Sequence, residues 1–230
     1  MSVSQSRVHR GAATDGRGRR SRSARGRLCF GLVVGIGLLS AGCGSQPTCS
    51  PMKGACYLNP KKDASHLGRV ALVEFENRSP FPDVPKDVAE TLYVALQKKQ
   101  RFGITSVAQA DPAWRSMQIG SGGPITPEQC TSMRQALQCD AVLTGIVTEY
   151  RPFPHLMIGL RLRLVDLTDG QLVWAVEQVW DSGDRATEAC IKKYLKAQTR
   201  SPRGSMADQL MVISSLNFMK FVAYEVSQTL

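Results

Sequence analysis

The stretch LMIGLRLRLVDLTDGQLVWAVEQVW, residues 156–180, decides the fold. Apolar residues alternate with other residues on both sides of Asp169-Gly170, a pattern typical of two strands that each bury one face. An Asp-Gly pair supplies the positive φ angles of a two-residue type I′ turn. The stretch is therefore predicted to form a β-hairpin whose register places Leu164 opposite Ala175.

The hairpin carries a candidate protein-binding face. In the predicted register, Arg161 and Arg163 have Trp174 and Trp180 as diagonal neighbours on one face. Arginine and tryptophan are enriched at binding hot spots, which makes these four residues a candidate site for a protein partner. The alternative is that a helix covers this face and that the tryptophans belong to the core. The frequency of helices on both faces of such sheets favours this alternative.

Strands and helices alternate ahead of the hairpin, and two helices follow it. The long apolar helix at the end of the chain is expected to pack on the sheet, because its edges are too polar for a membrane span. The expected elements are a strand at 69–77, a helix at 86–101, a strand at 102–107, a helix that begins at the capping box 126–129, a strand at 140–150, the hairpin, and helices at 183–195 and 206–230.

This order, β-α-β-α-β-β-β-α-α, predicts the fold class. Strand-helix-strand units imply parallel crossovers, and the late hairpin adds antiparallel strands. We expect a single α/β domain over residues 68–230, with a mixed β-sheet flanked by helices.

The start of the chain is typical of an export signal. Eight arginines precede the apolar run LCFGLVVGIGLLS at 28–40, which is shorter than the roughly 20 residues that a membrane-spanning helix needs. The run ends in Leu39-Ser40-Ala41-Gly42-Cys43, which resembles the bacterial lipobox. Residues 1–42 are thus predicted to be a lipoprotein signal peptide, and Cys43 the lipidated first residue of the mature protein. The alternative is an ordinary secretory signal with an incidental cysteine.

Residues 43–67 are rich in Ser, Pro, Gly and Lys, and we expect a lipidated N-terminus and linker there. Cys49 and Cys56 flank a short loop, and in an oxidising compartment they are the expected disulfide. The pairing of Cys130 and Cys139 is left open. Cys190 is expected to be a small buried hydrophobic residue.

The distribution of charge along the chain argues against nucleic acid as the main partner. The net charge of the chain is +10, but residues 1–42 contribute eight Arg and one Asp, or +7. The remaining 21 Lys and Arg against 18 Asp and Glu give the rest of the chain only +3, which leaves little for binding a phosphate backbone.

No motif indicates catalysis, a cofactor or a metal. The spacing of Cys49 and Cys56 is not that of a zinc site, and no histidine lies near them. The glycine cluster at 120–123 lacks the Lys-Ser/Thr pair of a phosphate-binding P-loop. The paired carboxylates, Glu74 with Glu76 and Asp166 with Asp169, are equally explained by solvated strand ends. We therefore expect a protein that is not an enzyme and has no cofactor, with a hydrolase as a distant alternative.

Several stretches taken in order resemble one protein family. They are RVALVEFEN at 69–77, RFGITSV at 101–107, CDAVLTGIVTEY at 139–150 and LRLRLVDLTDGQLVW at 160–174, all preceded by the lipobox. This order is similar to that of the curli-secretion lipoprotein (CsgG-like) family. That family shares its α/β domain with the lipoprotein activator of a penicillin-binding protein and with the N-terminal domain of TolB.

The resemblance implies an outer-membrane lipoprotein whose domain faces the periplasm and works by binding protein. We expect an adaptor or regulator in envelope assembly, anchored in the membrane by lipid, with an unidentified envelope protein as partner. The alternative is a CsgG-like secretion component that assembles as a homo-oligomer. No spare alternating hairpin of the length a membrane barrel needs is evident, which favours the adaptor.

Overall fold

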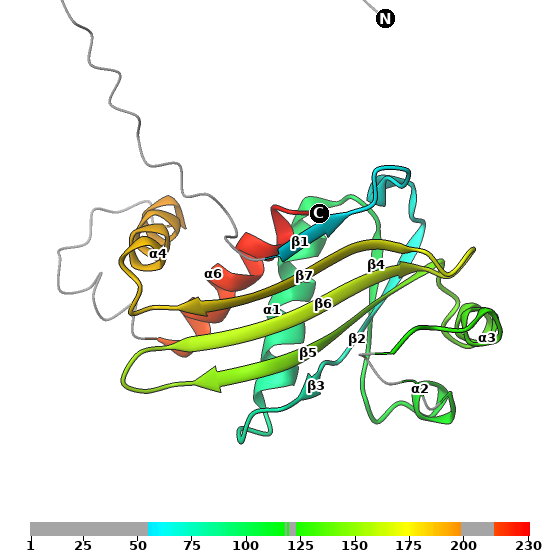
Figure 1. Ribbon diagram of the computed structural model, residues 1–230, viewed down its shortest axis with the longest axis horizontal. Helices are drawn as coiled ribbons and strands as arrows, with labels where there is room; N and C mark the ends of the chain where they lie inside the picture. The colour runs from blue at the N-terminus through cyan, green and yellow to red at the C-terminus, as the bar shows by residue number, and fades with distance from the viewer. Residues whose placement is uncertain (1–54, 118, 120–122, 199–213) are drawn as a thin grey trace, which may run out of the picture. The chain divides into compact units, whose positions relative to one another are not determined.

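A computed structural model describes residues 55–117, 119, 123–198 and 214–230 (Figure 1). These residues belong to one compact unit. The predicted signal peptide, Cys43 and Cys49 lie outside the described residues.

Seven strands form one mixed sheet in the order β1-β7-β6-β5-β2-β4, with the short β3 also paired to β5. Strand β2 runs parallel to β4 and β5, whereas β5, β6, β7 and β1 are antiparallel neighbours. The predicted single α/β domain with a mixed sheet is confirmed. The strands are β1 (Ala55–Leu58), β2 (Arg69–Val73), β3 (Glu76–Asn77), β4 (Gly103–Val107), β5 (Ala141–Arg151), β6 (Met157–Asp166) and β7 (Leu172–Asp181).

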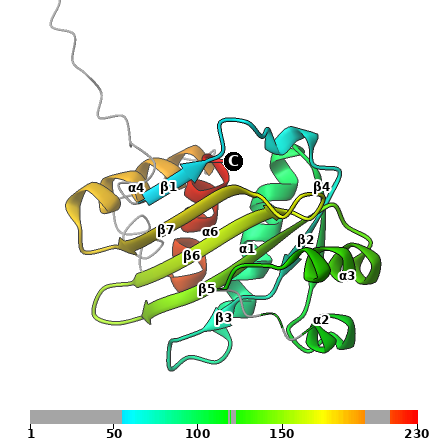
Figure 2. The same cartoon turned by 45° about the vertical axis from the view of Figure 1, so that its right-hand side comes forward.

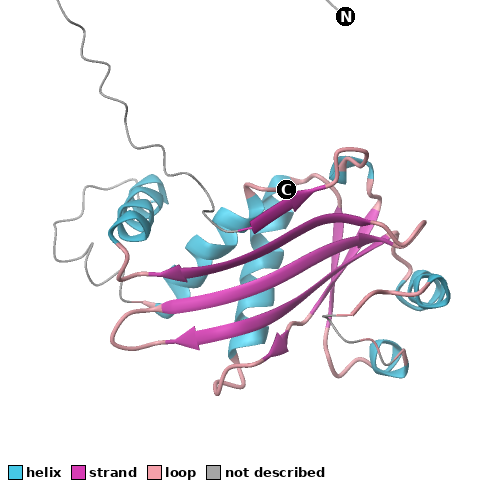
Figure 3. Ribbon diagram, in the orientation of Figure 1, coloured by secondary structure: helices cyan, strands magenta, loops and turns pink. Residues whose placement is uncertain are grey.

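The helices divide between the two faces of the sheet. Helices α1 and α6 lie behind the long strands in Figures 1 and 3, and α4 packs against α6. Helices α2 and α3 pack on the opposite face, at the end where β5 begins (Figure 2). The helices are α1 (Val84–Lys99), α2 (Pro112–Ser116), α3 (Pro127–Leu137), α4 (Arg185–Gln198) and α6 (Ser215–Ser227), and a 3-10 turn covers Ala64–His66.

Alternating side chains split the core in two. In β2, Leu72 packs with the cluster under α1 and α6, while its neighbour Val73 packs with the cluster under α2 and α3. Side chains on both faces of β2 are buried after Arg69, which explains why this strand is a continuous apolar run in the sequence. None of the described helices is long and apolar enough to cross a bilayer.

The capping box that the sequence predicts is present. The Thr126 hydroxyl accepts a hydrogen bond from the Gln129 backbone N–H, and the Gln129 side chain accepts one from the Thr126 backbone N–H. Two of the donors that every helix start leaves open are thereby satisfied, and α3 begins at Pro127 as expected.

The hairpin forms, but its turn is not the predicted one. The Gly170 N–H donates to Asp166 O and the Asp166 N–H to Gln171 O, so four residues rather than two close the loop. Gly170 has a φ of 73°, and Asp169 does not have the positive φ that a type I′ turn requires. The four-residue loop moves the pairing by two residues, and a register shift between the Leu164 and Val165 pairs moves it back by one, so Leu164 lies opposite Trp174, not Ala175.

The folded unit also begins earlier than expected. Residues 55–67, here called the strap, were expected to be linker. In the structure β1 pairs with β7 at the sheet edge, and Ala64 and Leu67 reach the core. The strap has no strand periodicity long enough to reveal this, because β1 is only four residues long.

The cysteines correct a second expectation about the strap. Cys56 lies on β1 as an exposed free thiol, so the predicted Cys49–Cys56 disulfide is not formed. Cys190, expected to be an isolated buried residue, is instead disulfide-bonded. Cys130 and Cys139 are free and buried. The sequence suggested a short loop between Cys49 and Cys56. In the structure Cys56 instead lies in the edge strand β1.

Candidate protein-binding site

The structure separates the four residues of the predicted binding face. Trp174 and Trp180 are 0% and 2% exposed and belong to the core under α1 and α6. The Trp174 Nε1–H donates to the Thr229 hydroxyl at 3.1 Å, which fixes the indole in the core. The expectation that both tryptophans share a face with the arginines is wrong, because a register shift between the Leu164 and Val165 pairs leaves the strands one residue out of the predicted register and side chains alternate between faces.

Arg161 and Arg163 lie on the other face, here called the open face. Arg161 is opposite Glu177, and its Nη2 lies 2.5 Å from Glu177 Oε1. This contact raises the pKa of Arg161 and lowers the pKa of Glu177. Both side chains are about half exposed, as is Val179 on the same strand. The Arg161–Glu177 pair is therefore accessible to a partner, and it contributes little to stability.

Arg163 is held more tightly than Arg161. Its Nη2 donates to Gly123 O at 2.9 Å, which ties the segment after α2 to the sheet. The pKa of Arg163 is lowered, because the effect of burial outweighs the opposite effect of the nearby Glu76 carboxylate. Thr144 lies directly across the strand pair from Arg163, and its buried hydroxyl has no hydrogen-bond partner among the described residues.

A cavity of about 420 Å³ adjoins the open face at the first turn of α4. Asp184 accepts hydrogen bonds there from the Thr187 N–H and hydroxyl, and so caps the helix start. The lining is polar and acidic, with Val179 as its apolar member. The lining residues are Thr148, Glu177, Gln178, Val179, Asp181, Asp184 and Thr187.

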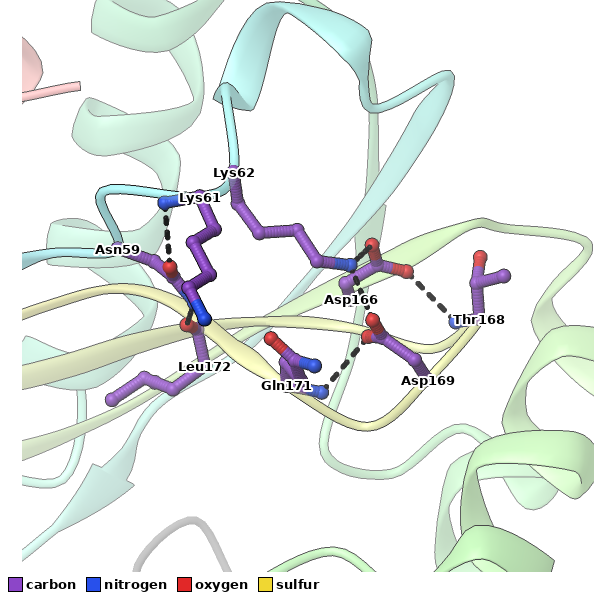
Figure 4. A network of polar contacts seen from close by, with 8 residues as sticks. All are labelled: Asn59, Lys61, Lys62, Asp166, Thr168, Asp169, Gln171 and Leu172. Atoms are coloured by element: carbon purple, nitrogen blue, oxygen red, sulfur yellow. Dashed lines mark hydrogen bonds and ion pairs between the residues drawn. The ribbon is translucent and has the colours of Figure 1, made fainter.

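A polar network holds the strap at the far end of the hairpin (Figure 4). Lys62 Nζ lies 2.5 Å from Asp166 Oδ2 and 2.6 Å from Asp169 Oδ2, bridging the two carboxylates. Asn59 adds a hydrogen bond of 2.9 Å from its side-chain amide to Leu172 O. Figure 4 shows the lysine reaching down from the strap between the two aspartates.

The pKa values around Lys62 agree with a structural role. Hydrogen bonds to Asp166 and Asp169 raise the pKa of Lys62. Burial would raise the pKa of Asp166, but its hydrogen bonds with Lys62 and Thr168 outweigh burial and lower it. Asp166 and Asp169 are thus both paired with Lys62. Of the other carboxylates singled out in the sequence, Glu74 accepts a hydrogen bond from the Gln109 N–H at 3.0 Å.

The two buried free cysteines, Cys130 and Cys139, are poor nucleophiles. Burial raises the pKa of Cys130, and it raises the pKa of Cys139 to about 11. Both thiols are therefore protonated at neutral pH. Within the described ranges no group of three His, Cys, Asp or Glu side chains could hold a metal ion.

Sequence reasoning found Arg161 and Arg163 but missed the residues beside them. Glu177 and Val179 alternate with the tryptophans along β7, so the sequence does show that they point away from Trp174 and Trp180. The missing information was the hairpin register. Thr148 and Thr187 come from distant segments and carry no local signal.

Comparisons with solved structures found distant matches, one of which is named as a lipoprotein. No family model and no curated protein matches the sequence. Among solved structures, the PelC dodecamer from Paraburkholderia phytofirmans is 15% identical, with a TM-score of 0.41, and the match covers 59% of this chain and 86% of that one. Lipoprotein GNA1162 from Neisseria meningitidis is 17% identical, with a TM-score of 0.41 and coverage of 59% and 99%.

A third structure, the LpoB C-terminal domain from Salmonella enterica, is 20% identical, with a TM-score of 0.36 and coverage of 49% and 82%. At these identities and TM-scores the likeness carries no argument about family or function. The CsgG-like family assignment stays a prediction from the sequence.

Proposed function

We propose that this protein is a lipid-anchored envelope protein that binds another protein through the open face of its sheet. Cys43 is the anchor, and the mature domain faces the periplasm from the outer membrane. The protein acts as an adaptor or regulator without catalysing a reaction.

The open face is the observation that carries this proposal. No described helix covers the part of β6 and β7 that presents Arg161, Glu177 and Val179, whereas the large apolar side chains on the other face of these strands are buried. The surface combines an ion pair, an exposed apolar side chain and an adjoining cavity. Such a mixed patch with arginine suits a protein interface better than a small-molecule site.

Co-purification tests the binding surface. The full-length protein, processed and lipidated in cells, is isolated from detergent-solubilised membranes with a C-terminal tag. Reversing one charge, Arg161→Glu, repels Glu177 and alters the centre of the open face. A protein that co-purifies with the wild type is expected to be lost with this variant.

The matched control is Lys192→Glu, which reverses a charge on the exposed side of α4, where Lys192 pairs with Glu188. The control variant is expected to retain the partner. Equal recovery of the partner with Arg161→Glu and with the wild type would contradict the proposed surface. The anchor is tested separately by the intact mass of the purified protein, which must include the lipid on a chain that begins at Cys43.

A further inference from the structure

The largest exposed apolar side chains of the domain include a group at one end of the sheet. Phe153 is 82% exposed, more than any other large apolar residue described. It lies in the loop between β5 and β6, between Pro152 and Pro154, which restrict the backbone on both sides. An aromatic ring held out in this way loses little conformational entropy when it is covered.

Two further apolar side chains lie at the same end. Phe81, 37% exposed, precedes α1 and packs edge-to-face on Tyr150, with ring centroids 5.2 Å apart. Leu216, 51% exposed, lies in the first turn of α6 beside Ser215, whose side chain is hydrogen-bonded to Tyr150. Tyr150 therefore joins three chain segments, and we call Phe81, Phe153 and Leu216 the apolar tip.

Charged groups surround the apolar tip. Arg78 is exposed, and Arg151 is exposed and lies 2.9 Å from Glu149. His155 and Asp83 are exposed in the same two loops. The segments that carry Phe81 and Phe153 therefore also carry exposed charged residues of both signs, with an arginine in each.

The direction of β1 shows from which end of the sheet the chain enters the domain. Strand β1 runs antiparallel to β7, with Ala55 opposite Glu177 and Leu58 opposite Trp174. The end of β7 beyond Glu177 pairs with Met157, beside the loop of Phe153. The chain therefore enters β1 from the side on which the apolar tip lies.

The length of the preceding segment limits how far the domain can move from its anchor. Eleven residues, 44–54, separate Cys43 from Ala55 and span at most about 40 Å. A domain of this size is itself about 40 Å across. A lipid at Cys43 would thus keep the side with the apolar tip within one domain diameter of the bilayer.

We infer that the apolar tip rests on the lipid bilayer that holds the anchor, with Phe153 inserted among the lipid headgroups and Arg78 and Arg151 at their level. This inference depends on the proposed lipid anchor. Shallow insertion of aromatic and aliphatic side chains beside basic residues is the usual form of interfacial binding.

The contact would orient the domain. Strands β5, β6 and β7 would rise from the bilayer, because the apolar tip lies where β5 ends and β6 begins. With the strands upright, both faces of the sheet would stand roughly perpendicular to the membrane plane, so lipid would not cover the open face. It would then be available to a partner in the periplasm.

Quenching by brominated lipid tests the inference on the full-length lipidated protein. The protein is reconstituted in vesicles of phosphatidylethanolamine and phosphatidylglycerol whose acyl chains carry bromine. A tryptophan is introduced as Phe153→Trp, and in a matched variant as Val94→Trp on the exposed side of α1, where Val94 is 47% exposed. The three native tryptophans are at most 3% exposed and give both variants the same background.

We expect at least about twofold more quenching for Phe153→Trp than for Val94→Trp, because only the first side chain enters the interface. Equal quenching in the two variants would overturn the inference. A blue-shifted emission from Phe153→Trp without bromine quenching would also overturn it, and would assign the apolar tip to a protein contact. The intact mass separates the two proposals, since a chain without lipid contradicts the anchor before quenching is measured.

Discussion

Strands β6 and β7 present two faces built from alternate residues, and the two faces differ in burial and in charge. On one face Leu162 and Trp174 are completely buried under α1 and α6. On the other, Arg161 and Glu177 form a half-exposed ion pair beside Val179. Substitutions on the first face should change stability, and substitutions on the second should change binding. The difference shows that the register of one hairpin decides which residues fold the domain and which are left for recognition.

The largest effect is expected from the buried face. Leu162→Ala removes a side chain with no exposed surface and leaves a cavity in the core that contains α1 and α6, so the free energy of unfolding should fall by about 2–5 kcal/mol. Urea denaturation followed by circular dichroism measures the change. Val179→Ala on the open face is the control and should change stability by less than about 0.5 kcal/mol. Similar losses for both variants would break the distinction between the faces.

A smaller loss of stability is expected at Gly145, where the packing leaves no space for a larger side chain. A Cβ atom at Gly145 would lie 2.4 Å from Leu162 Cδ2 and 2.7 Å from Phe75 Cδ1. Gly145→Ala should therefore lower the free energy of unfolding by about 1–3 kcal/mol through overpacking. Thermal unfolding checks this, with Gly123→Ala as the control, since nothing lies within 4 Å of a Cβ atom at Gly123. An unchanged melting temperature for Gly145→Ala would mean that β5 and Phe75 are less tightly packed than described.

The strap gives an intermediate effect that depends on pH. Lys62→Met leaves Asp166 and Asp169 without their cation and should lower the free energy of unfolding by about 1–2 kcal/mol at neutral pH, between the values of exposed and buried pairs. Because the pKa of Asp166 is lowered in the folded protein, its stabilisation is present above the ordinary Asp pKa and is lost as the pH falls through the folded-state value.

The wild type and Lys62→Met should therefore converge in stability at acidic pH, as denaturation at several pH values would show. Lys61→Met is the matched control, because Lys61 contributes its backbone N–H to Asn59 in this network. A stability difference for Lys62→Met that stays constant with pH would show that the carboxylates are not its cause.

The smallest effect is expected at Cys56. Its thiol is free and exposed on β1, so Cys56→Ser should change the free energy of unfolding by less than about 0.5 kcal/mol. Peptide mapping without reductant should recover Cys56, Cys130 and Cys139 as free thiols and Cys190 in a disulfide. A fall of several kcal/mol for Cys56→Ser, or recovery of Cys56 in a disulfide, would restore the pairing that the sequence suggested.

Local signals in the sequence were sufficient for most of the fold. Periodicity located the long strands and α1, and the Thr126 capping box placed the start of α3 at Pro127. They failed where tertiary contacts decide the outcome. Strand β1 is recognisable only through its pairing with β7, and the Lys62 bridge that holds the strap joins residues 104 positions apart.

The candidate site was half predictable for the same reason. Alternation alone places Arg161 and Arg163 on a common face. Which residues of β7 join them depends on the register shift between the Leu164 and Val165 pairs, because the change from a two-residue to a four-residue loop moves the pairing by two residues and exchanges no faces. A shift of one residue exchanged Trp174 and Trp180 for Glu177 and Val179.

Photo-crosslinking in living cells tests the central claim most directly. A benzophenone amino acid replaces Val179 on the open face or, in the matched variant, Val94 on α1, two valines that are 52% and 47% exposed. Both variants should be lipidated and as stable as the wild type. We expect a discrete crosslinked product of higher mass from position 179 and none from position 94. No product at position 179, or the same product from both positions, would contradict the assignment of the open face as the partner-binding surface.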